Sequence, residues 1–383
     1  MKRILTLLFL LAGFSAAAQV VQSPRYEHFK ELRNQADTLQ MKQMLDNWGE
    51  KDAEFYAAWV NYCSVMADET QDPTWLEMGV NWAKMGRDAY PDEDLLLHKQ
   101  SDALFDNEQL QEALPLLEEI EQKGLGDIVT WHHLSIIYGA KGDFAQSRKY
   151  LEKMIQNGDE EDLAYAQEVM AVYDELERQA DSLAFHPDHA AIKAVSQTPA
   201  YQELTARFAA CDSTLTREEI ATVYYGAAYI HNYEYVQAEC ADIRTLAEEG
   251  KIKEAKEALE AKLKEYPVSL FLLVSLFNLA ENEEEQMSPV WKAQQILTVI
   301  DNTGRMDDPK QPFQVICIND EYIAIEQLLG AREFKSQAAV RGVADDPLDK
   351  MTFVNSFGLE QIAYFWLTPP YWERLNRLFG GND

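Results

Sequence analysis

The sequence predicts a mostly α-helical protein: an α-solenoid of helical hairpins followed by a C-terminal α+β part that carries a small β-sheet. Three observations support this prediction. Large apolar residues recur three and four positions apart along most of the chain, which is typical of one face of a helix. Two segments in the N-terminal half repeat one pattern 34 residues apart. Close to the C-terminus, short runs rich in Val, Ile, Phe, Tyr and Trp indicate strands.

Residues 1–18 have the three parts of a secretory signal peptide. Met1-Lys2-Arg3 is basic, residues 4–14 are apolar, and a run of small residues ends at Ala18. The apolar stretch is shorter than the roughly 20 residues that cross a bilayer. We therefore expect cleavage between Ala18 and Gln19. The mature protein would be exported, periplasmic or secreted, with no integral membrane segment.

The charge and the missing motifs narrow the function. The chain of 383 residues has a formal net charge of −31. Such a charge repels phosphate backbones, so nucleic acid is not expected as a partner. The sequence has no Gly-x-Ser-x-Gly motif and no Gly-rich phosphate loop. We therefore expect a protein or peptide partner, no cofactor and a non-catalytic role, while the oligomeric state stays open.

The chain has four cysteines, Cys63, Cys211, Cys240 and Cys317. None belongs to a Cys-x-x-Cys pair, so no structural zinc site is predicted. Disulfides are permitted outside the cytoplasm. However, a chain of this length can bury a sufficient core without them. Disulfides and free thiols both remain open.

A helical repeat domain is predicted over residues 19–185. Its two best-matched units begin at Asp94 and Ile128, and each predicts two helices with large apolar residues at corresponding positions. Residues 52–69 and 73–91 predict another hairpin before them, and a helix through about Ser182 follows them. Both units have small residues at their eighth and twentieth positions, where paired helices would approach closely. These residues are Ser101 and Ala113 in the first unit, and Ser135 and Ser147 in the second.

The two units resemble the tetratricopeptide repeat. Trp131, Leu134, Tyr138 and Gly142 stand at signature positions of that family. The chain departs from the family pattern in two ways: Ser replaces the first signature Gly in both units, and the closing Pro is absent. Pro115 falls inside a predicted helix, where it would kink the chain or cost about 3 kcal/mol. The resemblance implies a solenoid whose inner face, lined by the first helix of each unit, binds a peptide or a protein.

The residues expected on this inner face lie between the packing positions of the first helices. They are His98, Ser101, Asp102, His132 and Ser135. His132 is followed by a second histidine, but neighbouring residues on a helix diverge by about 100°. The two imidazoles therefore cannot chelate one metal ion, and no metal site is predicted.

A linker is predicted at residues 186–199, which contain two prolines, and a C-terminal domain at residues 200–383. Thr216 and Glu219 form a capping-box pattern that begins a helix. A further hairpin is expected over residues 236–267. The remaining predicted elements are helices at 269–281 and 288–302 and strands at 313–318, 351–356 and 362–367.

The C-terminal half resembles a family of secreted bacterial proteins, domain-of-unknown-function family 4919, over about residues 195–383. The resemblance depends on short motifs in a fixed order. They are Tyr201…Arg207-Phe208, Leu215-Thr216 with Glu218-Glu219, Tyr224-Tyr225-Gly226, Asn319-Asp320-Glu321-Tyr322 and Tyr364-Phe365. The resemblance implies an organisation and a type of host, but no chemistry.

Two groups in this half are candidate sites for an alternative function, that of a carbohydrate-active or other hydrolase. Asp320, Glu321 and Tyr322 follow a predicted strand, where adjacent side chains point to opposite sides, so the two carboxylates converge only if the chain turns. Alternatively, Asn319 and Asp320 cap a turn or the next helix. Tyr225 and Tyr229 share a helical face that could stack a sugar ring or pack against a neighbouring hairpin. A small-ligand module without catalysis is a third possibility.

Overall fold

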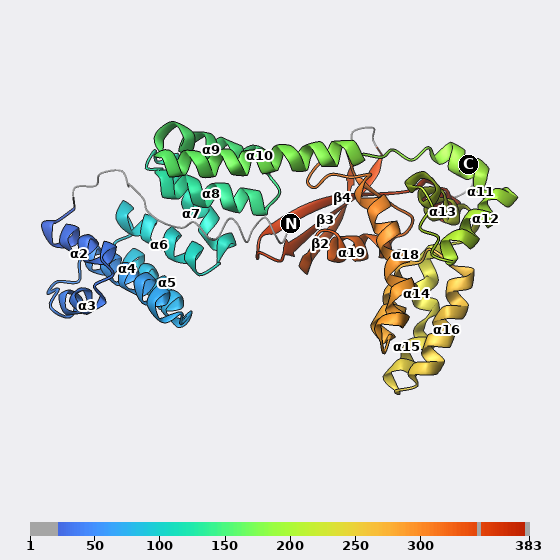
Figure 1. The fold of residues 1–383 in the computed structure, drawn as a ribbon, viewed down its shortest axis with the longest axis horizontal. Coiled ribbons are helices and arrows are strands. Elements are labelled where there is room, and N and C mark those ends of the chain that lie inside the picture. Colours follow the sequence, from blue (N-terminus) through green and yellow to red (C-terminus); the bar gives the residue numbers. More distant parts are fainter. Residues whose placement is uncertain (1–21, 343–345, 380–383) are drawn as a thin grey trace. The chain divides into compact units, whose positions relative to one another are not determined.

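The computed structural model describes residues 22–342 and 346–379. The predicted signal peptide, residues 1–18, lies outside the described residues together with its cleavage site. The described chain is mostly helical, with one small sheet near the C-terminus (Figure 1), which confirms the predicted fold class. The chain forms two compact units. Unit 1 comprises the residues up to Glu177 together with Phe357–Glu360, and unit 2 comprises Arg178–Ser356 and the residues from Gln361 onward.

The described part of unit 1 starts with two short helices that were not predicted from the sequence, α2 (Pro24–Asn34) and α3 (Thr38–Asp46). Three helical hairpins follow, and α6 and α8 begin at the predicted residues. The hairpins are α4 (Ala53–Thr70) with α5 (Thr74–Ala89), α6 (Asp94–Asp106) with α7 (Leu110–Gln122), and α8 (Ile128–Ala140) with α9 (Phe144–Asn157). Helix α7 continues through the exposed Pro115. The next helix, α10 (Glu160–Leu183), extends past the last residue of unit 1.

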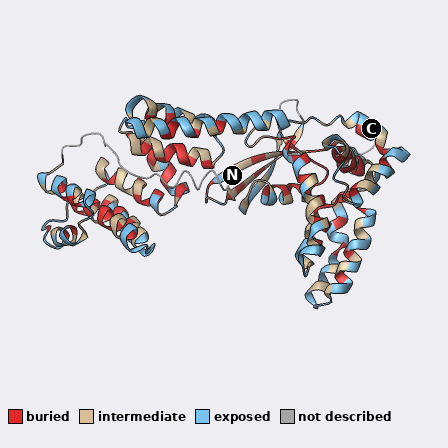
Figure 2. Cartoon of the chain, in the orientation of Figure 1, coloured by how far each residue is buried: buried red, intermediate tan, exposed pale blue. Residues whose placement is uncertain are grey.

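Small residues lie where the two helices of a hairpin pack together, as predicted. Ser101 and Ala113 are fully buried in one hairpin, and Ser135 and Ser147 are buried in the next. The hydroxyl of Ser147 on α9 donates a hydrogen bond to the main-chain carbonyl of Ser135 on α8, at 2.7 Å. Buried residues, red in Figure 2, lie along the facing sides of the paired helices. This close approach fixes the geometry of each hairpin.

The segment predicted as a linker, residues 186–199, contains helix α11 (His189–Ser196). The carboxylate of Asp188 caps this helix by accepting hydrogen bonds from the main-chain N–H groups of Ala190 and Ala191, at 3.1 and 3.0 Å. Pro199 is the first residue of the next helix, where a proline is tolerated because that position needs no N–H donor. The segment is therefore more regular than its prolines indicated.

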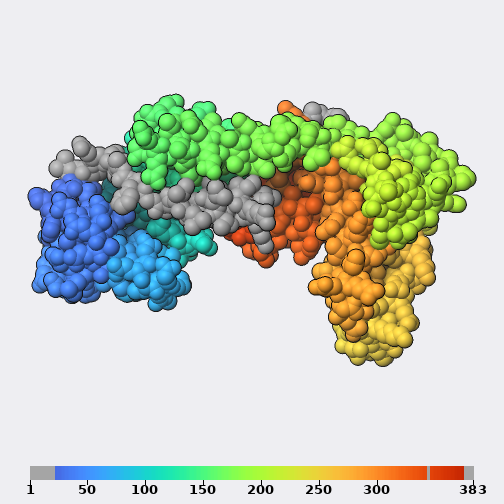
Figure 3. Space-filling model, viewed as in Figure 1, coloured from blue at the N-terminus to red at the C-terminus, as the bar shows by residue number. Residues whose placement is uncertain are grey.

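Unit 2 consists of helices and a sheet. Helix α13 (Arg217–Ile230) begins with the predicted capping box, in which Thr216 and Glu219 each accept a hydrogen bond from the other's main-chain N–H. The predicted hairpin at 236–267 corresponds to α15 (Ala241–Glu248) and α16 (Ile252–Glu265), yellow in Figure 3. The other elements are α12 (Pro199–Ala209), the 3-10 turn η1 (Tyr233–Tyr235), α14 (Val236–Glu239), α17 (Leu270–Leu279), α18 (Glu283–Asp301), α19 (Ile318–Gln327) and α20 (Pro369–Phe379).

The sheet has four strands in the order β1-β4-β3-β2. They are β1 (Phe313–Val315), β2 (Ala331–Arg341), β3 (Pro347–Asn355) and β4 (Glu360–Leu367). β1 is parallel to β4, and β2 is antiparallel to β3. The strand predicted at 313–318 ends at Val315, because the chain enters α19 at Ile318. Strand β2 was not predicted, because it is polar, mostly exposed and without apolar alternation, as expected for an edge strand.

Helix α13 lies in the core of unit 2 and is buried along most of its length. Gly226 on this helix faces the ring of Tyr201, and a Cβ atom at that position would lie 2.6 Å from a ring carbon. The hydroxyl of Tyr201 donates to the main-chain carbonyl of Val223, at 2.8 Å. The glycine therefore permits α12 and α13 to pack closely. None of the described helices is both long and apolar enough to cross a membrane.

Candidate functional site

In unit 1, a polar group lies on the neighbouring first helices α6 and α8. Asp102 on α6 pairs with Lys99 on the same helix, with 3.0 Å between its Oδ2 and the lysine Nζ. Its other oxygen, Oδ1, lies 3.8 Å from Nδ1 of His133 on α8. Burial acts to raise the pKa of Asp102, but the charges of Lys99 and His133 hold it below its usual value. Asp102 is therefore ionised at neutral pH.

The two histidines of α8 lie in confined surroundings. His133 is 7% exposed, its ring stacks on Phe105 with centroids 3.8 Å apart, and its Nδ1 has no hydrogen-bond partner among the described residues. His132 is half-buried, with its ring 4.9 Å from that of Tyr165. Burial lowers the pKa of His133 to about 4 and that of His132 to about 3. Both rings are therefore neutral at pH 7, with donor and acceptor nitrogens.

The structure separates the residues predicted for the inner face into two sets. His98, Asp102 and His132 are partly exposed and stay candidates for contact with a partner. Ser101 and Ser135 are buried, and their hydroxyls donate to the main-chain carbonyls of His98 and His132, at 2.8 and 2.7 Å. These two serines are therefore packing residues, and their assignment to the inner face is wrong. Small residues at the eighth position of a repeat serve helix packing.

In unit 2, Asp320 lies in the first turn of α19 and is 2% exposed. Its Oδ2 accepts a hydrogen bond from the hydroxyl of Tyr224, at 2.7 Å, and this hydroxyl in turn accepts one from the N–H of Ile316, at 3.3 Å. Burial raises the pKa of Asp320 to about 7, against the opposing effect of the Tyr224 hydrogen bond. Asp320 thus holds a proton over much of the neutral range.

Glu321, the next residue, is fully buried and points to a different set of partners. The side-chain amide of Gln337 on β2 donates both to Glu321 Oε2, at 3.1 Å, and to Asp349 Oδ2, at 2.9 Å. The other oxygen of Glu321 has no partner within the described chain. Burial, followed by the neighbouring Asp349, raises the pKa of Glu321 well above its usual value. The exposed Tyr322 donates a hydrogen bond from its hydroxyl to the side-chain amide oxygen of Gln337, at 2.7 Å.

Glu234 completes a carboxyl cluster, which we define as Glu234, Asp320, Glu321 and Asp349. It accepts a hydrogen bond from the N–H of Ile318, at 3.0 Å, and burial raises its pKa. The chain turns directly into α19 at Cys317, so the helix begins before Asn319 and Asp320, which were predicted to cap it. Because Asp320 and Glu321 have separate partners on α13 and on β2, they do not form an acid and base pair on one open site.

The aromatic pair predicted on α13 is mainly structural. Tyr225 is fully buried, and its hydroxyl donates to the main-chain carbonyl of Gln314 on β1, at 3.2 Å. Tyr229 is half-buried, with its hydroxyl 3.4 Å from the carbonyl of His189. A sugar ring cannot stack on a tyrosine that the protein covers, so Tyr225 belongs to the core. Of the two interpretations of this helical face, packing against neighbouring elements agrees better with the structure than stacking of a sugar.

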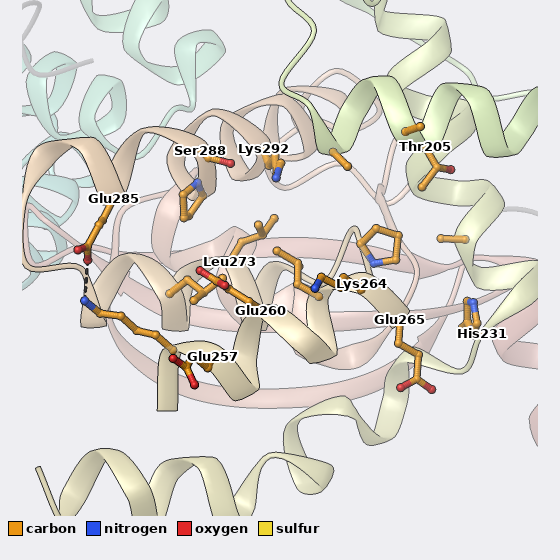
Figure 4. Close-up of a pocket in the computed structure, with 18 of the residues that line it drawn as sticks. Thr205, His231, Glu257, Glu260, Lys264, Glu265, Leu273, Glu285, Ser288 and Lys292 are labelled. Atoms are coloured by element: carbon orange, nitrogen blue, oxygen red, sulfur yellow. Dashed lines mark hydrogen bonds and ion pairs between the residues drawn. The ribbon is translucent and has the colours of Figure 1, made fainter. Parts of the chain in front are cut away.

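A pocket of about 1050 Å³ in unit 2 was not anticipated from the sequence. It is lined by side chains from α12, α13, α16, α17 and α18 (Figure 4). Lys292 of α18 lines it and is 8% exposed. One feature of the sequence could have indicated the pocket. Lys292 shares a helical face with Pro289 and Ile296, which are three and four positions away and both buried. A lysine in an apolar helical face indicates either a salt bridge or a ligand.

Metal ligation and disulfides have little structural basis in residues 22–342 and 346–379. No group of three or more His, Cys, Asp or Glu side chains is placed there to hold a metal ion. All four cysteines are free thiols, and Cys63, Cys240 and Cys317 are buried. The candidate sites therefore consist of side chains that bind by hydrogen bonds, charge and apolar contact.

Comparison with known proteins agrees with the organisation of the C-terminal half. Unit 2 is a helical domain with an appended sheet, a class that has no fixed chemistry. Residues 188–365 match the model of a family described as a domain of unknown function (DUF4919). This match supports the resemblance drawn from the sequence motifs. No curated protein matches the chain.

Proposed function

We propose that the protein is exported and acts as a non-catalytic binding or scaffolding protein. Its helical repeats, which resemble tetratricopeptide repeats, would bind a protein or peptide partner along their first helices. The observation that carries this proposal is the polar group on α6 and α8, in which Asp102 lies 3.8 Å from the buried His133. The partly exposed His98 and His132 adjoin this group on the same two helices.

The chemistry of this polar group favours a partner segment that donates hydrogen bonds and carries positive charge. Asp102 is ionised and keeps part of its surface open to solvent, with 25% of its side chain exposed. Asp106, one helical turn further along α6, contributes less negative charge, because desolvation, followed by the neighbouring Asp102, raises its pKa to about 7. The chain as a whole has a formal net charge of −31, which attracts cationic segments and speeds their association. A basic peptide or a basic loop of a partner protein fits these conditions.

Affinity capture with the mature protein tests this proposal. The mature chain is immobilised and exposed to an envelope or secretion extract of its own cells, and the retained proteins are identified by mass spectrometry. The same experiment is run with Asp102→Lys, which should weaken capture of a genuine partner about tenfold because like charges then meet. The matched control is Glu112→Lys, the same charge change at an exposed position of the second helix α7.

Two results would count against the proposal. The first is equal loss of capture in both variants, which would reflect net charge alone. The second is retention of small molecules or sugars with no protein. Sequencing the N-terminus of the exported protein provides a separate test of export, with Gln19 expected as the first residue.

The alternative proposal is a hydrolase with its site around Asp320 and Glu321. Carboxyl groups with raised pKa values occur at many active sites. Here both are buried, and a substrate in solvent cannot touch them in this conformation. Release of reducing sugars from polysaccharides by the mature protein, compared with folded Asp320→Asn, separates the two proposals. Turnover that disappears in this variant would favour the hydrolase.

A further inference from the structure

The pocket in unit 2 contains a lysine that no group of the described chain neutralises. Lys292 is 8% exposed, and its side chain makes no hydrogen bond or ion pair with any described residue. Another lysine of the pocket differs in this respect: Lys256 pairs with Glu285 at 2.6 Å and with Glu281 at 3.2 Å. In Figure 4, Lys292 extends from α18 toward the interior of the pocket, close to Ser288.

Lys292 is the most buried of the four lysines that line the pocket, and proteins normally place a carboxylate or another acceptor beside the ammonium group of such a lysine. The chain has an abundance of acidic residues, so a partner for Lys292 would be easy to supply. We propose that the pocket binds a small amphipathic monoanion, a carboxylate with an apolar body, whose head pairs with Lys292. The carboxylate of the ligand provides the negative charge that pairs with Lys292.

The walls of the pocket suit the apolar body of such a ligand. Leu273 and Leu276 of α17 and Pro289 of α18 line it and are themselves buried. Its volume, about 1050 Å³, lies at the upper end of the usual range for small-molecule sites. A chain of about ten carbons fits within it, with its head at Lys292 and its tail along α17.

The charges that line the pocket restrict the ligand to a single negative charge. Five glutamates and four lysines line it, and Lys256 is already neutralised by two glutamates. Glu257 and Glu260 are exposed and would repel a multiply charged head such as a phosphate monoester. One unpaired, buried lysine matches one carboxylate. This site is separate from the polar group on α6 and α8, and the inference does not depend on the proposed partner surface.

Two probes with the same apolar chain and opposite charge test the inference. Decanoate and decylammonium are titrated calorimetrically into the mature full-length protein. Decanoate should bind at least about tenfold more tightly, because its carboxylate forms a charge-assisted hydrogen bond with Lys292, whereas the ammonium group of the other probe is repelled by it. Lys292→Met, which keeps the length of the side chain and removes its charge, should abolish this preference. The matched control Lys264→Met, at an exposed position of the same pocket, should retain it.

A second variant keeps the test valid should Lys292→Met fail to fold. Ala206→Trp places a large ring in the pocket from an exposed position of α12 and leaves Lys292 unchanged. It should lower the affinity for decanoate at least about tenfold by filling the space. Equal affinity of the wild-type protein for decanoate and decylammonium would overturn the inference. So would a folded Lys292→Met variant that still prefers decanoate.

Discussion

His133 in unit 1 and the carboxyls of Asp320 and Glu321 in unit 2 are buried titratable side chains whose effects on stability change with pH in opposite directions. Unit 1 buries neutral imidazoles: His133 stacks on Phe105, with a pKa lowered to about 4 by burial. Unit 2 buries protonated carboxyls: burial raises the pKa of Asp320 to about 7 and that of Glu321 well above its usual value. In both units burial favours the neutral form of the group, because moving a charged group out of water costs free energy.

The sign of the pH dependence follows from the direction of each shift. A carboxyl whose pKa is raised on folding stabilises the folded form below its unfolded pKa, and this contribution is lost as the pH rises through the folded pKa. A histidine whose pKa is lowered stabilises the folded form above about pH 6.5, and this contribution is lost as the pH falls toward the folded pKa. The contribution of Asp320 to stability should therefore be lost between about pH 4 and 7 as the pH rises, and that of His133 between about pH 6.5 and 4 as the pH falls.

The largest expected effect is at Asp320. Asp320→Asn keeps an acceptor for the Tyr224 hydroxyl and removes the titration. Relative to wild type, the variant should gain on the order of 1.4 kcal/mol for each pH unit between about 4 and 7. The measurement is urea unfolding at several pH values, with the unfolded form of α13 and α19 detected by pulse-labelling hydrogen exchange.

Glu326→Gln is the control for this experiment, since Glu326 is exposed on the same helix and should leave the pH dependence unchanged. A constant difference between Asp320→Asn and wild type across the pH range would mean that Asp320 is ionised in the folded state. The contrast between the units would then rest on Glu321 alone.

The next effect in size is at His133. His133→Phe preserves the stacking on Phe105 and removes the imidazole. Between about pH 6.5 and 4 the variant should become more stable relative to wild type, by a total of about 3 kcal/mol. Unfolding in urea, followed by hydrogen exchange of α6 and α8, measures it. The exposed His28→Phe on α2 serves as the comparison and should show no such trend.

The two units also show which features of the structure could be predicted from the sequence and which could not. The repeat register at Asp94 and Ile128 was predictable, because helix periodicity and small residues are local properties. The hydrogen bond of Asp320 could not be predicted, because its partner Tyr224 lies 96 residues away in sequence. His133 was not assigned to the inner face, because its contact with Asp102 depends on how adjacent hairpins stack.

Two alternatives that the sequence left open are decided by burial. Ser101 and Ser135 were predicted both to pack helices and to line the inner face, and burial decides for packing. Tyr225 was predicted either to stack a sugar ring or to pack, and its burial in the core of unit 2 decides for packing. A residue type and its spacing indicate which face of a helix it occupies. They do not indicate which face the rest of the protein covers. For the same reason the pocket around Lys292 could not be predicted from residue types and spacing.

The smallest expected effect is at the contact between the paired helices of unit 1. Ser147→Ala removes the hydrogen bond to the carbonyl of Ser135 and the contact with the hydroxyl of Tyr173, at 3.0 Å. It should lower the free energy of unfolding of unit 1 by about 1 kcal/mol, without changing its pH dependence. Ser182→Ala, at an exposed position near the end of α10, should be neutral. If Ser147→Ala is also neutral, the close approach of α8 and α9 depends on the small size of the residue. Ser147→Val, which adds volume to the buried contact, should then destabilise the unit by about 1 to 3 kcal/mol.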